Sequence, residues 1–89
     1  MTTKPNFYHW RSQAGGEVDL LLEWNGKFYP IEIKIKTTPE IRDCRGIESF
    51  RQTYPNLPLM PALIVCPSHS MYPLKKDVFV MPWNARVKI

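Results

Sequence analysis

The amino-acid sequence predicts a small α/β domain with one mixed sheet. Three observations lead to this fold class: an Asn25-Gly26 pair between two alternating runs, a helical stripe after them, and an apolar run at residues 62–66. Asn-Gly between alternating runs is typical of a two-residue β-hairpin. The expected order is an antiparallel three-stranded meander, one crossover helix and two further strands. The 89 residues suit a single core.

The first strand is expected at residues 7–12, because its aromatic side chains favour a pleated surface. Residues 1–6 are polar and contain Pro5, so they are expected to be a flexible lead-in. Residues 7–89 then form a single domain.

The hairpin that follows has a register that can be counted from its turn. If Asn25 and Gly26 are the whole loop, Asp19 lies opposite Glu32. Side chains alternate between the two faces of a strand, so an apolar face and a charged face separate. The expected core face consists of Val18, Leu20, Leu22, Trp24, Ile31, Ile33 and Ile35, and the charged face of Glu17, Asp19, Glu32, Lys34 and Lys36.

The charged face carries the functional hypothesis. Directly opposed residues have Cβ atoms about 5 Å apart, and two carboxylates at that distance share a proton, contact a cation or bind a divalent metal. Asp19 and Glu32 are therefore candidate ligands of Mg²⁺ or Mn²⁺. With Lys34 beside them, these residues form a set of groups suited to metal-assisted phosphodiester hydrolysis, in which Lys34 would orient the attacking water. Glu17 is an auxiliary ligand or base.

Arg11 and Lys36 are the candidate phosphate contacts, since a guanidinium beside the carboxylates can hold a phosphate bidentately. Other interpretations stay open. Arg11 can instead pair with Glu17. The whole face can also be a solvated surface, on which Glu17 pairs with Lys34, Asp19 and Glu32 point to water, and Lys36 guards an edge.

The chain resembles two known families. Asp19 followed by Glu32-Ile33-Lys34 resembles the D…(D/E)xK signature of the PD-(D/E)XK nuclease superfamily, which implies a truncated restriction-endonuclease-like core. Most of the chain also resembles the C-terminal domain of unknown function of certain prokaryotic AAA-type ATPases. That second resemblance is carried by Tyr8-x-Trp10-Arg11, Gly16-Glu17-Val18-Asp19, Ile31-Glu32-Ile33-Lys34, Gly46-Ile47-x-x-Phe50 and Val80-Met81-Pro82-Trp83. It implies a terminal module, since the chain has no GxxxxGK[ST] phosphate loop.

The second half of the chain supplies the crossover. Thr38 and Pro39 suit a helix start, although Gly46 weakens the middle of this helix and moves the expected start toward Asp43. The helix should end near Tyr54, before Pro55. Its expected sheet-facing stripe is Ile41, Cys44, Ile47 and Phe50, with Arg42, Arg45 and Arg51 facing away.

The last segments complete the sheet. A right-handed crossover leads to a parallel strand at 62–66, expected to be covered on both faces. Residues 67–76 are expected to be a loop, 77–83 a last strand at an edge because of Pro82, and 84–89 a basic tail.

The composition of the chain indicates which kinds of partner it can bind. The net charge of +4 favours an anionic partner, so DNA is expected, with an AAA-type ATPase and a second copy of the chain as further candidates. No apolar run is long enough to cross a bilayer. Cys44 and Cys66 lack CxxC spacing and no cleavable leader is present, which indicates the reducing cytoplasm. The alternative to a nuclease is a non-catalytic nucleic-acid-binding or protein-interaction module.

Overall fold

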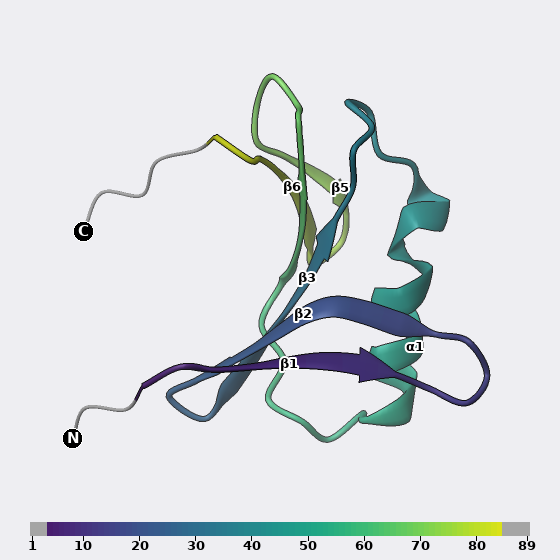
Figure 1. Ribbon diagram of the computed structural model, residues 1–89, viewed down its shortest axis with the longest axis vertical. Coiled ribbons are helices and arrows are strands. Elements are labelled where there is room, and N and C mark those ends of the chain that lie inside the picture. Colours follow the sequence, from purple (N-terminus) through teal and green to yellow (C-terminus); the bar gives the residue numbers. More distant parts are fainter. Residues whose placement is uncertain (1–3, 85–89) are drawn as a thin grey trace.

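The computed structural model describes residues 4–84 as a six-stranded mixed sheet with one helical layer (Figure 1). The elements follow in the order β1 (Asn6–Arg11), β2 (Glu17–Trp24), β3 (Lys27–Ile33), the 3₁₀ turn η1 (Ile41–Cys44), α1 (Arg45–Thr53), β4 (Ala62–Cys66), β5 (Tyr72–Lys75) and β6 (Val78–Pro82). In space the strands are ordered β1-β2-β3-β4-β6-β5. The predicted α/β class, meander and crossover are confirmed.

The hairpin between β2 and β3 has the predicted turn and register. Asn25 and Gly26 both have positive φ angles, 54° and 75°, as a type I′ turn requires. Trp24 pairs with Lys27, and Leu20 pairs with Ile31. Glycine and asparagine are the residues that adopt this backbone at low cost, which is why the turn could be predicted from sequence.

The predicted core face of the hairpin is confirmed at Val18 but is wrong at three of its other residues. Between the pairs Tyr8–Leu21 and Trp10–Val18, β1 has one residue and β2 has two, so β2 carries a bulge that brings both Val18 and Leu21 toward the helix. Ile33, which was expected in the core, is 52% exposed. Of the other expected core residues, Trp24 and Ile35 are also exposed. Both faces of the hairpin contain apolar residues, so alternation alone did not decide which face the helix covers.

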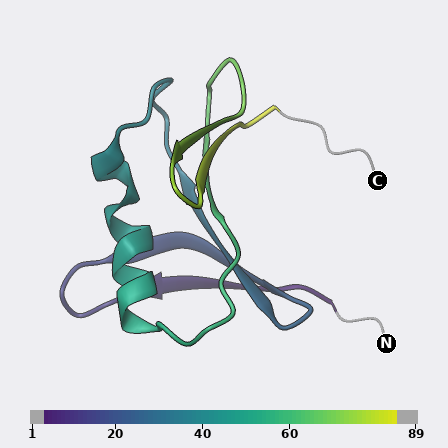
Figure 2. The ribbon, with the colours of Figure 1, turned by 180° about the vertical axis from the view of Figure 1, so that it is seen from behind.

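The helical layer lies on one side of the sheet in both views of the ribbon (Figures 1 and 2). η1 starts after Glu40, not at Thr38, and Asp43 caps it by accepting a 2.7 Å hydrogen bond from the Glu40 N–H. The expected stripe is confirmed at Cys44, Ile47 and Phe50. It is wrong at Ile41, which is 56% exposed because it begins η1, before the chain packs on the sheet.

The core lies between the helical layer and the sheet. One cluster joins Cys44 and Ile47 to Ala62, Ile64 and Val78 of β4 and β6. A second cluster joins Phe50 to Val18 and Leu21, with Trp10 packed at its side. The ring centroids of Trp10 and Phe50 lie 5.2 Å apart in an edge-to-face arrangement. The helix therefore ties both halves of the sheet together.

β4 is central, but it is covered on one face only. Ala62, Ile64 and Cys66 are buried against the helical layer, whereas Leu63 and Val65 are partly exposed. The expected cover on both faces is therefore wrong, because the described residues contain one helical layer and it lies on one side of the sheet (Figure 2).

The C-terminal segments also differ from the prediction. The expected loop at 67–76 contains a strand, β5, which pairs antiparallel with β6 around a turn where Asp77 has a φ of 60°. β6 lies between β4 and β5, so the edge strand is β5. Pro82 does not prevent this because it is the last residue of β6. Of the expected lead-in at 1–6, residues 1–3 lie outside the described residues, and Asn6 already belongs to β1. Of the expected basic tail at 84–89, residues 85–89 lie outside the described residues.

Arg51 was expected to face away from the sheet and does not. Its guanidinium donates a 2.7 Å hydrogen bond to the carbonyl oxygen of Asp77 and lies 3.3 Å from Glu48. Glu48 also pairs with Lys75 of β5. These contacts fix α1 over the β5–β6 hairpin. Within residues 4–84, no helix has the length and apolar character needed to span a membrane.

Gly46 provides a first test of how the helix packs. A Cβ atom at this position would lie 1.9 Å from the carbonyl oxygen of Glu17, so Gly46→Ala forces α1 away from β2. We expect it to lower the free energy of unfolding by about 1–3 kcal/mol, although alanine is the better helix former by about 1 kcal/mol. Urea denaturation measures this. Gln52→Ala on the exposed side of α1 is the control, and equal stability of the two variants would contradict the close packing.

Glu48 provides a pH test. The hydrogen bond from Lys75 and the nearby Arg51 lower the pKa of Glu48 below its ordinary value of 4.5. The unfolded chain therefore binds this proton more readily, so the stabilisation is present above pH 4.5 and is lost as the pH falls through the lowered pKa. We expect Glu48→Gln to be less stable than the wild type at pH 7 and the difference to shrink in acid. Denaturation at several pH values checks this, with Lys75→Met expected to reproduce the effect.

Candidate active site

β2 and β3 separate at the point where Asp19 and Glu32 face each other. The regular ladder ends at the pair Leu20 and Ile31. Beyond it, the Asp19 N–H donates a 2.7 Å hydrogen bond to Glu32 Oε1, and the Ile33 N–H donates a 2.9 Å bond to Asp19 Oδ2. Each acid thus accepts a backbone N–H from the other strand. The two carboxylates take the place of the next backbone bonds in the ladder.

Beyond the last pair with β2, β3 continues beside β4. Glu32 lies beside Ile64, and the Lys34 N–H donates a 3.0 Å hydrogen bond to the carbonyl oxygen of Val65. The separation opens a cleft of about 660 Å³ on the helical side of the sheet. Its walls are the turn at 14–16, the start of β2, the end of β3 and residues 42–49 of η1 and α1.

The cleft brings together the four predicted catalytic residues. Asp19, Glu32, Lys34 and Glu17 all line it. Glu32 is only 4% exposed, so the interpretation in which it points to water is wrong. Lys34 Nζ lies 3.7 Å from Glu32 Oε2, and it is Glu32, not Glu17, that it pairs with.

Burial is the main electrostatic influence on Glu32. Loss of contact with water raises the pKa of Glu32 above its ordinary value, and the charges of Asp19 and Glu17 act in the same direction. The hydrogen bond from the Asp19 N–H and the charge of Lys34 lower the pKa of Glu32 and offset part of this effect. A cation in the cleft would stabilise the charged form further, which makes the pair a suitable place for one.

Glu17 is turned partly away from the pair. Its Oε2 lies 3.3 Å from Arg11 Nη2 and 3.6 Å from His9 Nε2. This is the alternative pairing that the sequence left open for Arg11, whose side chain is 70% exposed and does not line the cleft. Lys36 is also outside the lining, where it contacts Asp43 and Glu40 at 3.0 and 3.5 Å. The structure therefore does not bring the two predicted phosphate contacts into the cleft.

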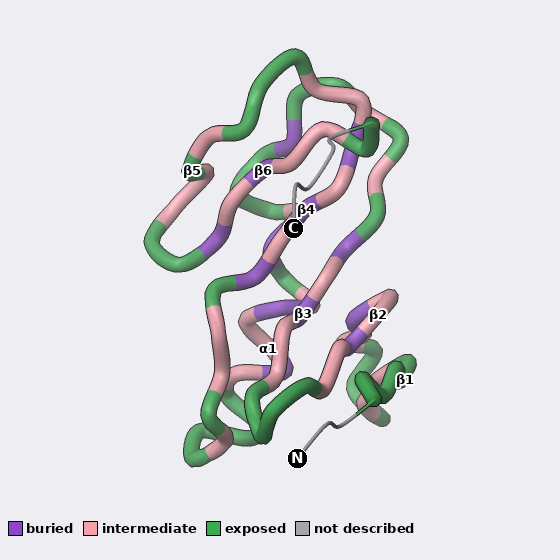
Figure 3. The backbone as a smooth tube through the Cα atoms, turned by 90° about the vertical axis from the view of Figure 1, so that its left-hand side faces the viewer, coloured by how far each residue is buried: buried purple, intermediate pink, exposed green. Residues whose placement is uncertain are grey.

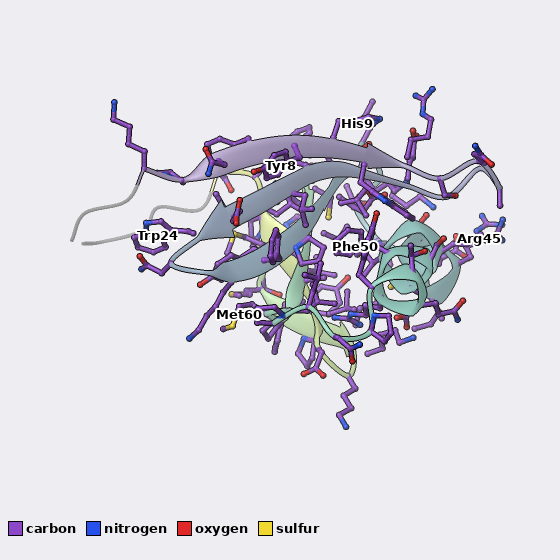
Figure 4. All side chains as sticks on the ribbon, turned by 90° about the horizontal axis from the view of Figure 1, so that it is seen from below. Tyr8, His9, Trp24, Arg45, Phe50 and Met60 are labelled. Atoms are coloured by element: carbon purple, nitrogen blue, oxygen red, sulfur yellow. The ribbon has the colours of Figure 1, made fainter. Side chains whose placement is uncertain are left out.

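Arg42 and Arg45 line the cleft and were not predicted as site residues. Arg42 pairs with Glu40 at 3.0 Å, whereas Arg45 has no ion-pair partner among residues 4–84. In Figure 4, Arg45 projects from the helical layer toward the turn between β1 and β2. A sequence signal for these residues does exist. They lie three apart at the start of the predicted helix, soon after Glu32-Ile33-Lys34, and the start of a helix that directly follows a strand lies near the end of that strand.

The residues present fit a hard divalent cation in part. Asp19 Oδ1 and Glu32 Oε2 are the carboxylate oxygens that do not accept these two hydrogen bonds from the backbone. Mg²⁺ is commonly held by one or two carboxylates and completes its coordination with water and substrate phosphate. Within residues 4–84, no group of three or more histidine, cysteine, aspartate and glutamate side chains is arranged to hold a metal. The cleft thus offers a two-carboxylate site.

Comparison with known proteins adds family context. The family described as Domain of unknown function (DUF4143) matches residues 1–85. This agrees with the expected resemblance to a domain of unknown function at the C-terminus of AAA-type ATPases. The chain is 37% identical over 79 residues to an uncharacterized protein of Mycobacterium tuberculosis and to one of Mycobacterium bovis. Each alignment covers 88% of this chain but 17% of the relative. No solved structure matches.

The buried carboxylate predicts a pH effect on stability. Because burial raises the pKa of Glu32, the folded chain keeps this proton to a higher pH than the unfolded chain. The free energy of unfolding should therefore fall as the pH rises from about 4.5 through the raised pKa. Glu32→Gln keeps an acceptor for the Asp19 N–H and removes this loss, so we expect it to be more stable than the wild type at pH 7.

Urea denaturation at several pH values, in the presence of a chelator, measures this difference. Glu23→Gln, a change on the same strand as Asp19 but outside the cleft, should keep the wild-type pH dependence. Equal pH dependence of the wild type and Glu32→Gln would contradict the assignment of the effect to Glu32.

Proposed function

The chain belongs to the DUF4143 family, and from the geometry of its cleft we propose that it is a metal-dependent phosphodiesterase module acting on DNA. One observation carries the proposal: Asp19 and Glu32 are bound to each other's strands, line one cleft and have Lys34 beside them. A surface pair that only needed solvation would have no reason to bury Glu32 to 4% exposure.

Asp19 and Glu32 would hold Mg²⁺ or Mn²⁺ through Oδ1 and Oε2, the carboxylate oxygens that do not accept the two backbone hydrogen bonds. The ion supplies charge neutralisation on the phosphate and acidifies a bound water. Lys34 Nζ, 3.7 Å from Glu32, positions the attacking water and offsets the negative charge that develops on the phosphate. The backbone hydrogen bonds fix both carboxylates in advance, which keeps the cost of organising the site low.

Arg45 is the proposed phosphate contact in place of Arg11 and Lys36. It lines the cleft and has no ion-pair partner among the described residues, so binding a phosphate breaks no existing pair. A guanidinium suits a phosphodiester because it donates two parallel hydrogen bonds. The lining contains no aromatic side chain, so the cleft lacks a stacking platform for bases. We expect the cleft to contact the sugar-phosphate backbone of DNA and to show no preference among the bases.

The second candidate function is a non-catalytic binding module that works with an AAA-type ATPase. Two observations favour it. Among residues 4–84 no third carboxylate is placed to hold a metal together with Asp19 and Glu32, and the family is associated with AAA-type ATPases. In this case Lys34 and Arg45 would bind nucleic acid or an acidic protein segment without cleaving it.

A nicking assay on supercoiled DNA with Mg²⁺ or Mn²⁺ separates the two candidates. Asp19→Asn keeps an oxygen for the Ile33 N–H but weakens metal binding, and Lys34→Met removes the ammonium. We expect each to lower the cleavage rate about a hundredfold or more. The matched controls Glu23→Gln and Lys27→Met lie outside the cleft and should cleave like the wild type.

Calorimetric titration with Mn²⁺ tests the metal site without relying on cleavage. The wild type should release or absorb heat on binding, and Asp19→Asn should not. Cleavage that survives both Asp19→Asn and Lys34→Met would contradict the proposed site. Absence of both cleavage and metal binding in the wild type would leave the binding module as the function.

A further inference from the structure

The two edge strands of the sheet differ in exposure, since β1 is mostly exposed and β5 is mostly of intermediate burial (Figure 3). β5 is four residues long, contains Pro73 and has an irregular register between Pro73 and Lys75. A short strand with proline and a bulge resists the addition of another strand. β1 at the opposite edge is six residues long, contains no proline, and the extra residue of its bulge belongs to β2.

The charged side chains of β1 do not guard its free edge. Arg11 and His9 both contact Glu17 of the neighbouring strand β2, at 3.3 and 3.6 Å. The aromatic residues Phe7 and Tyr8 are exposed, at 58% and 46%. An edge strand that is long, free of proline and flanked by exposed aromatic side chains is a template for pairing with another strand.

We propose that the occupant of this edge is β1 of a second copy of the chain, paired antiparallel. The symmetry of such a pair limits its register. The twofold axis must run perpendicular to the sheet, so both copies keep the same face toward their helices. Opposed residues then come from the same face, and the axis passes midway between one residue of β1 and the same residue of the second copy; an axis at His9 or Tyr8 is named below by that residue.

An axis through His9 gives the complementary register. It places Phe7 opposite Arg11 of the second copy, and Tyr8 opposite Trp10, each pair occurring twice. Arg11 over the Phe7 ring is a cation–π contact, and Tyr8 extends the aromatic cluster in which Trp10 packs on Phe50. An axis through Tyr8 would instead oppose Phe7 to His9 and place Arg11 beyond the end of the strand. Complementarity therefore selects His9.

The dimer would place the two clefts on one face. Asp19 lies beside the axis residue, since its carbonyl oxygen is 3.4 Å from His9 Nδ1. Three strand spacings then separate the two Asp19 residues, or about 15 Å. The dimer itself does not depend on the proposed phosphodiesterase activity, because β1 pairs whether or not the cleft cleaves DNA.

Cysteine cross-linking of the whole chain tests the register directly. In His9→Cys the two new thiols face each other across the axis at a Cα separation that a disulfide spans. Under mild oxidation this variant should form a covalent dimer, whereas Tyr8→Cys should not. The native Cys44 and Cys66 are buried and free, so they do not compete. Cross-linking of Tyr8→Cys, or of neither variant, would overturn the proposed register.

Light scattering after gel filtration tests the dimer without a cross-link. The wild type should become a dimer as its concentration rises. Phe7→Glu faces Arg11 of the second copy and should keep the dimer, whereas Phe7→Lys faces the same residue with like charge and should weaken it about tenfold relative to Phe7→Glu. A monomeric wild type, or equal dissociation constants for the two variants, would overturn the proposal.

Discussion

Two hydrogen bonds between side chain and backbone hold the centre of this structure. Where β2 and β3 part, Glu32 accepts from the Asp19 N–H and Asp19 accepts from the Ile33 N–H. Without Glu32 the Asp19 N–H would be an unsatisfied donor in a partly buried place, which costs about 1–3 kcal/mol, whereas the Ile33 N–H lies in an exposed place. The same carboxylates line the cleft, so the groups that allow the strands to separate are also the groups available for chemistry.

The features that the sequence predicted are those set by local geometry. The Asn25-Gly26 turn determines which residues of β2 and β3 are opposed, and that register brought Asp19 and Glu32 together as expected. The helix position followed from the stripe of Cys44, Ile47 and Phe50. The covered face of the hairpin did not follow, because both faces contain apolar residues and the bulge in β2 depends on pairing with β1. β5 was missed because Pro73 and Lys75 resemble loop residues.

The site was predicted where it depends on the hairpin and missed where it depends on the crossover. Asp19, Glu32 and Lys34 lie within or just after two consecutive strands. Arg45 reaches the same cleft only because α1 packs against β2, with Gly46 close to the carbonyl oxygen of Glu17. Contacts between segments so far apart in the sequence have no local pattern, and Arg11 and Lys36 were chosen from neighbouring positions that the structure uses for ion pairs.

β3 pairs with two different strands, and this affects the order in which the strand pairings form during folding. Its first half pairs antiparallel with β2 across a two-residue turn, whereas its second half pairs parallel with β4, more than thirty positions later in the sequence. Short loops close faster than long ones, so the hairpin should form early and the parallel pairing late. We therefore expect the two acids to be brought together early in folding, and the walls of the cleft to assemble only with the parallel pairing of β3 and β4.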